Sequence, residues 1–106
     1  MFEPIHSLER LDEVIETEPF ALIYVSLPSC SVCHALLPQL ESALKETALK
    51  AYRIDAHELP QIASRLEIMT VPAVLFFAHG KEYIREARFV QVTKLKEQIN
   101  MLMEVA

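Results

Sequence analysis

Six consecutive apolar residues, Phe20 to Val25, stand between Pro19 and Pro28 in the first third of the chain. The run is rich in β-forming residues and is far shorter than the ~20 residues that a membrane span needs. Unbroken hydrophobicity of this length is typical of a strand covered on both faces, as in a parallel sheet. The segment 73–78 repeats the pattern. We therefore expect an α/β fold in which helices cover both faces of the sheet.

The segments around these two strands show helical or alternating patterns. In chain order we expect a helix capped by Ser7 that ends near Thr17, the strand 20–25, a helix to about Lys45 that contains Pro38, a strand at 49–55, a short helix at 59–66, the strand 73–78, an antiparallel edge strand at 81–90 after the turn His79-Gly80, and a final helix capped by Thr93. This order predicts a central mixed, mostly parallel sheet with a C-terminal antiparallel hairpin and helix. At 106 residues, the whole chain 1–106 is expected to form a single domain.

Composition excludes several classes of function. Gly80 is the only glycine, so neither a dinucleotide fingerprint nor a P-loop is present, because both need several glycines. Fifteen acidic against ten basic residues give a formal net charge of −5, which does not suit nucleic acid or an anionic membrane surface. The acidic N-terminal segment lacks the features of a signal peptide. We therefore expect a cytoplasmic protein with no nucleic-acid or membrane partner.

Two cysteines, Cys30 and Cys33, follow the first apolar strand at the expected start of a helix. In open α/β sheets the functional site lies at such a carboxyl end of a strand. The unpaired N–H groups and dipole of a helix N-terminus favour a thiolate at Cys30. Cys33 falls on the apolar face of the same helix, where it is shielded. An exposed attacking thiolate and a buried resolving thiol are the requirements of thiol–disulfide exchange. No bound cofactor and no metal are needed.

The chain resembles the thioredoxin family over nearly its whole length. The resemblance rests on Cys30-Ser31-Val32-Cys33 after a buried strand, on Pro38 five residues past the second cysteine, and on Thr70-Val71-Pro72 before the second buried strand. It implies the thioredoxin fold and a cis proline at Pro72 beside the cysteines. It also implies that Val71 pairs its backbone with an extended substrate. Val71 and Pro72 are therefore expected to bind substrate.

Several residues depart from the family pattern. Ser29 replaces the usual tryptophan, and Ser31-Val32 replaces the usual glycine and proline between the cysteines. Tyr24 and Ala51 occupy the positions of a buried acid and its lysine partner. The relay that would take a proton from the resolving thiol is therefore missing, and Tyr24 is a poor base. His34 is a second possible modulator, since it follows Cys33 directly and could favour the Cys30 thiolate.

The sequence predicts a thiol–disulfide oxidoreductase with Cys30 as nucleophile and Cys33 as resolving thiol. Its expected partners are disulfide-containing proteins or small molecules, and an upstream disulfide reductase that returns electrons. An interaction module with little or no redox turnover is the alternative from another class. Two further alternatives come from Cys30, Cys33 and His34: c-type haem attachment through C-x-x-C-H, and a zinc site completed by a second chain.

Overall fold

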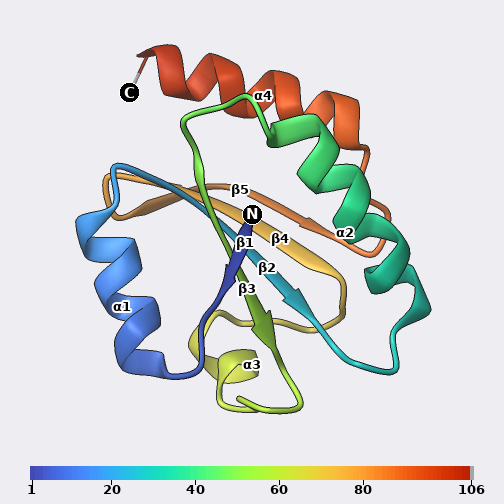
Figure 1. Ribbon diagram of the computed structural model, residues 1–106. Coiled ribbons are helices and arrows are strands. Elements are labelled where there is room, and N and C mark those ends of the chain that lie inside the picture. Colours follow the sequence, from blue (N-terminus) through green and yellow to red (C-terminus); the bar gives the residue numbers. More distant parts are fainter. Residues whose placement is uncertain (106) are drawn as a thin grey trace.

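A computed structural model describes residues 1–105 of the chain (Figure 1). Its elements in order are β1 (Phe2–Pro4), α1 (Leu8–Thr17), β2 (Phe20–Ser26), α2 (Ser31–Leu44), β3 (Lys50–Asp55), α3 (Ile62–Arg65), β4 (Ala73–Ala78), β5 (Lys81–Ala87) and α4 (Val92–Val105). Ser7 caps α1 as expected, since its hydroxyl accepts a hydrogen bond from the Arg10 N–H. Among the described residues, no helix is both long and apolar enough to cross a membrane.

The five strands form one mixed sheet in the order β1-β3-β2-β4-β5. β3 pairs in parallel with both β1 and β2, whereas β4 pairs antiparallel with β2 and with β5. β4 therefore runs against the other four strands, and the expected mixed, mostly parallel sheet is confirmed. All six residues of β4 and the inner five of β2 are buried, which explains why these runs carry no charged residue.

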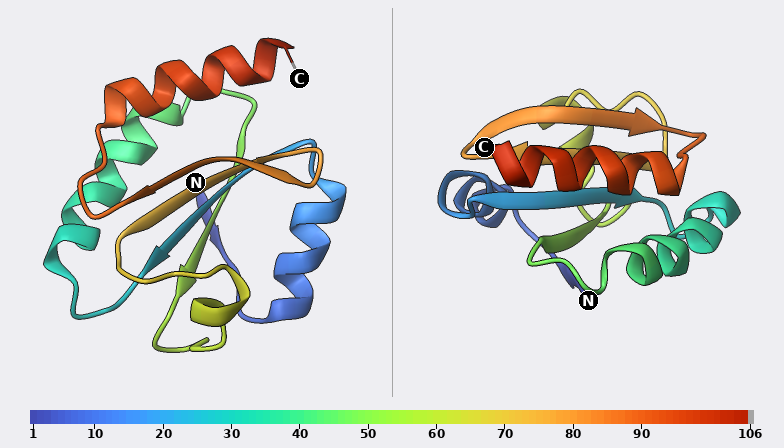
Figure 2. Two further views of the ribbon diagram at one scale, coloured as in Figure 1. Left: turned by 180° about the vertical axis from the view of Figure 1, so that it is seen from behind. Right: turned by 90° about the horizontal axis from the view of Figure 1, so that it is seen from above.

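Helices cover both faces of the sheet, as expected. α1 and α3 pack on one face, where Leu11, Ile15 and Ile62 join the inward side chains of the strands. α2 and α4 lie side by side over the other face, where Leu40 and Leu95 are completely buried (Figures 1 and 2). The sheet is thus the middle layer between two apolar clusters, which holds the carboxyl end of β2 and the start of α2 in fixed positions.

The structure differs from the sequence expectation at four places. The short helix expected at 59–66 spans only Ile62–Arg65. β1, only three residues long and ending in Pro4, was not predicted. The proposed Thr93 cap is wrong, because α4 already begins at Val92 and the Gln91 carbonyl accepts the Leu95 N–H at 2.9 Å. β5 ends at Ala87 and not near residue 90, because Arg88 has a φ of 67°, which interrupts an extended strand.

Candidate active site

The loop that follows β2 leads directly into α2 (Figure 1). The two cysteines lie at the N-terminus of this helix. Cys30 is the N-cap residue, and its sulfur accepts a hydrogen bond from the Cys33 N–H at 3.1 Å. The two sulfurs are bonded to each other, and the Cα atoms lie 5.2 Å apart, inside the usual range for a disulfide. The C-x-x-C segment thus has the geometry of a dithiol–disulfide couple.

The two cysteines differ sharply in exposure. Cys33 is 2% exposed and belongs to the apolar cluster beneath α2, where Leu36 and Leu40 are its helical neighbours. Cys30 is only partly buried and lines a surface groove of about 390 Å³. A partner molecule in that groove would therefore meet the sulfur of Cys30 and not that of Cys33.

Three separate segments form the groove. Its lining residues are Ser29, Cys30, Ser31 and Val32 from the start of α2, Thr70, Val71 and Pro72 from the loop before β4, and Arg88 and Phe89 from the loop after β5. The Val71–Pro72 peptide bond is cis. The Pro72 carbonyl accepts the Arg88 N–H at 2.9 Å, which ties the second segment to the third. Val71 and Pro72 thus lie beside Cys30, although about forty positions separate them in the chain.

Tyr24 lies beneath the first turn of α2 with 1% of its surface exposed. Its hydroxyl donates a hydrogen bond to the backbone carbonyl of Cys33. Burial raises the pKa of Tyr24 to about 12, so the phenol is neutral at physiological pH. Ala51 lies in the same apolar cluster, and among residues 1–105 no charged residue is buried. Within this region, the Cys33 sulfur therefore has no buried acid or lysine beside it.

His34 is exposed and does not line the groove at Cys30. One of its ring nitrogens, Nε2, lies 2.7 Å from the Pro28 carbonyl oxygen, which places Nε2 as the donor. The ring borders a different hollow, together with Arg53 and Asp55 from the end of β3. The structure therefore directs His34 away from the partner-accessible side of Cys30. Among residues 1–105 no group of three or more His, Cys, Asp or Glu side chains gathers as a metal site would require.

Arg88 and Phe89 are the groove residues that the sequence analysis missed. Phe89 is 85% exposed, and the Arg88 guanidinium carbon lies 5.8 Å from the centre of its ring. The only sequence signal was an isolated aromatic residue at the end of a charged, alternating segment, which had been included in the strand. The left-handed backbone at Arg88 interrupts the extended strand, and Arg88 and Phe89 line the groove together with Cys30.

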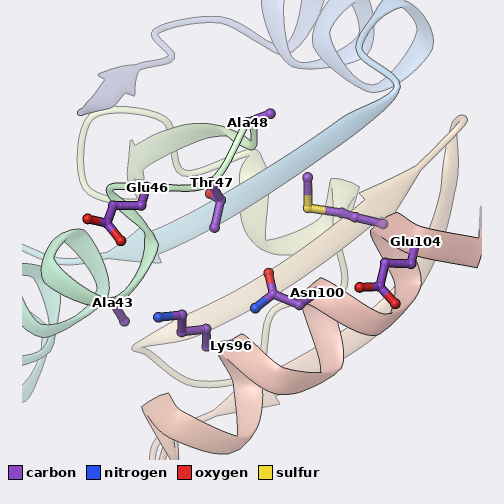
Figure 3. Close-up of a pocket in the computed structure, with 8 residues that line it drawn as sticks. Ala43, Glu46, Thr47, Ala48, Lys96, Asn100 and Glu104 are labelled. Carbon is purple, nitrogen blue, oxygen red and sulfur yellow. The ribbon is translucent and has the colours of Figure 1, made fainter.

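A larger hollow of about 440 Å³ lies elsewhere, between α4 and the loop that follows α2. Figure 3 shows Lys96, Asn100 and Glu104 of α4 facing Glu46 and Thr47 of that loop. It shares no residue with the groove and contains no cysteine. Size alone therefore does not identify the reactive site of this chain.

Comparisons with known proteins agree on one family. The thioredoxin family profile matches residues 5–103. The thioredoxin-like protein YdfQ of Bacillus subtilis (strain 168) is 40% identical over 96 residues, which cover 90% of this chain and 86% of that protein. A thioredoxin of Rickettsia bellii is 29% identical and covers 84% of this chain and 87% of its own length. A mutant thioredoxin from Halobacterium salinarum NRC-1 superimposes with a TM-score of 0.87 at 24% identity, over 98% and 94% of the two chains. The expected fold is confirmed.

Proposed function

Because this chain belongs to the thioredoxin family, we propose that it is a thiol–disulfide oxidoreductase that exchanges protein or small-molecule disulfides through the Cys30–Cys33 couple. The observation that carries the proposal is the bonded sulfur pair at the start of α2, with Cys30 open to the groove and Cys33 buried. Exchange needs this asymmetry, since only one thiol should meet the substrate.

The first step uses Cys30 in its reduced form. The thiolate attacks one sulfur of a substrate disulfide, a new Cys30–substrate bond forms, and the other substrate sulfur leaves as a thiolate. The free backbone N–H groups at the start of α2 favour the negative charge on Cys30. In the present geometry the Cys33 N–H already points to the Cys30 sulfur, at 3.1 Å.

The second step resolves the mixed disulfide. Cys33, as a thiolate, attacks the Cys30 sulfur, the Cys30–substrate bond breaks, and the substrate leaves as its second thiolate. The substrate gains two electrons and the Cys30–Cys33 pair loses two. An upstream dithiol reductase then returns these electrons and restores both thiols. No bound cofactor takes part.

The environment of Cys33 supports a slow resolving step. Its proton must go to solvent or to the departing substrate thiolate, because Tyr24 is neutral and bonded to a carbonyl oxygen instead. Turnover limited in this way rises with pH until the resolving thiol itself titrates. The missing acid is also the observation that favours the second candidate, an interaction module that docks partners in the groove with little or no turnover.

Val71 and Pro72 are proposed to position the substrate. Neither backbone group of Val71 takes part in a hydrogen bond with another residue in the described part of the chain, so both are available to an extended segment in the groove. Pro72 has no N–H and contributes the apolar floor next to Cys30. We further propose that residues 1–106 act as one domain, and that the protein works in the reducing cytoplasm.

A redox titration separates the two candidates. The protein is equilibrated in mixtures of reduced and oxidised glutathione, and the Cys30–Cys33 state is read by mass after alkylation. A reversible two-electron transition, together with reduction of a disulfide substrate by dithiothreitol that depends on the protein, supports the oxidoreductase. If the Cys30–Cys33 pair shows no reversible couple, the result supports the interaction module instead. The Cys33→Ser variant then traps substrates as stable mixed disulfides with Cys30.

A further inference from the structure

We propose that Arg88 selects substrates that carry an acidic residue next to the reactive cysteine in an extended protein segment. The inference rests on the proposed exchange at Cys30, and adds the chemistry of the preferred substrate. Arg88 and Cys30 line the same groove, so the residue that flanks a disulfide bound at Cys30 lies in the groove that Arg88 borders.

The charge of the groove is opposite to that of the whole chain. The formal net charge is −5, yet Arg88 is the one charged side chain among the groove residues. No carboxylate within residues 1–105 forms an ion pair with Arg88, whereas Arg10, Arg65 and Arg85 all have acidic partners. Glu86, nearby in sequence, does not line this groove but an adjoining hollow, which shares Phe89 with it. The guanidinium is therefore available to an anion from outside.

Arg88 is the one residue of the groove lining that has a positive φ, a conformation it shares in the described chain with Glu67 and His79. Its φ of 67° lies in the left-handed region, where glycine fits without cost and a residue with a Cβ is disfavoured. Strain of this kind is concentrated at binding and catalytic sites, where the surrounding structure holds it in place. Here the Arg88 N–H is held by the Pro72 carbonyl, so the position of the side chain is linked to the loop that carries Val71.

The available backbone of Val71 favours a peptide over a small molecule. Strand-like pairing with Val71 would fix the direction of a bound segment across Cys30. Phe89, beneath the guanidinium at 5.8 Å, limits the directions in which Arg88 can turn and offers an apolar surface to the rest of the segment. A carboxylate one position from the reactive cysteine matches the planar donor pattern of arginine.

The test measures one chemical step in the Cys33→Ser background. Three peptides of the same length carry a single cysteine bonded to the same neutral nitropyridyl thiol, and the residue next to the cysteine is Glu, Gln or Lys. The Cys30 thiolate attacks the peptide sulfur, and the coloured nitropyridyl thiolate leaves. The rate is recorded for Arg88, Arg88→Gln, Arg88→Lys and Arg88→Gly. Any influence of residue 88 on the Cys30 thiolate changes the reaction rates of all three peptides by the same factor. The ratio of the Glu-peptide rate to the Gln-peptide rate therefore reports only how residue 88 recognises the neighbouring side chain.

With Arg88 present, the Glu peptide should react roughly three- to fivefold faster than the Gln peptide at low salt, and the Lys peptide more slowly. The preference should disappear in Arg88→Gln, persist in part in Arg88→Lys, and shrink in high salt. Arg88→Gly should lose the preference while unfolding at the same or a higher urea concentration, which excludes damage to the fold. The control Lys50→Gln removes the same charge at the start of β3, the opposite end from the cysteines, and should keep the preference.

Equal rates for the three peptides, or a preference that survives in Arg88→Gln, would overturn the proposal. Glutathione disulfide is the further probe: if its rate falls as much as that of the Glu peptide in Arg88→Gln, the peptide assignment is wrong. Failure of the proposed function is a separate result, namely no reversible couple in the protein with both cysteines. The ratio can be read in either case, because it needs only the Cys30 thiolate.

Discussion

Replacing Tyr24 with phenylalanine tests how the first turn of α2 is anchored to the sheet. The change removes one hydroxyl and keeps the ring, which is 1% exposed and packs edge-on against Phe2 with ring centres 6.0 Å apart. The Cys33 carbonyl then loses the hydroxyl donor in a place that water does not reach. Loss of one partner from a buried hydrogen bond costs about 1–3 kcal/mol, so Tyr24→Phe should lower the free energy of unfolding at pH 7 by that amount.

The penalty should also depend on pH in a way that packing alone would not produce. Burial raises the pKa of Tyr24 in the folded protein to about 12, above its ordinary value of about 10 in the unfolded chain. The stability that the neutral phenol contributes is therefore complete below pH 10 and is lost as the pH rises toward 12. The phenylalanine variant has no phenol at position 24, so it does not lose this contribution to stability in that range. The difference between the two proteins should shrink by roughly 0.5–1 kcal/mol at pH 10.5.

Urea unfolding of the oxidised proteins at pH 7, 9.5 and 10.5 measures both effects. Tyr83→Phe is the matched control, because Tyr83 is 49% exposed and its removal should change stability by a few tenths of a kcal/mol at most. An unchanged midpoint for Tyr24→Phe at pH 7 would show that the hydroxyl does not anchor the helix. A penalty that stays constant up to pH 10.5 would refute the reasoning on burial.

Three further outcomes are expected. After reduction, iodoacetamide should modify Cys30 roughly tenfold or more faster than Cys33, which is 2% exposed, and peptide mass spectrometry that finds equal rates would reverse or remove the assigned roles. Leu40→Ala, at a completely buried position under α2, should cost about 2–5 kcal/mol in urea unfolding, and a loss below 1 kcal/mol would contradict the packing described. Disulfide reduction by the wild-type protein should rise up to tenfold per pH unit between about pH 6 and 8, and a flat profile would mean that another group takes the proton from Cys33.

Much of the fold could be predicted because the strongest sequence signals come from burial. β2 and β4 are apolar without interruption because helices cover both of their faces. Such an uninterrupted apolar run can be recognised in the sequence alone. β1 lacked such a signal, since three residues that end in Pro4 carry no periodicity. The Thr93 cap failed because a hydroxyl near a helix start does not determine which residue first adopts helical backbone.

The site likewise has some features that the local sequence determines and others that depend on the whole fold. Cys30 and Cys33 are close in sequence and on one helical turn, so their meeting follows from local geometry. The position of Arg88 in the groove does not, because it depends on a left-handed residue and on a hydrogen bond to Pro72, sixteen positions earlier in the chain. The hydrogen-bond partners of His34 and Tyr24 likewise depend on side-chain directions that no spacing rule provides.

The strand order has a consequence for how the chain assembles during synthesis. β2 lies at the centre of the sheet, yet both of its neighbours, β3 and β4, come later in the chain. The one hairpin of neighbouring strands in the described chain is β4–β5, near the C-terminus. A nascent chain that ends before β4 leaves one edge of its most apolar strand without a partner, and unpaired apolar edges promote aggregation. Release of residues 73–87 from the ribosome is therefore the point at which the sheet can close over β2.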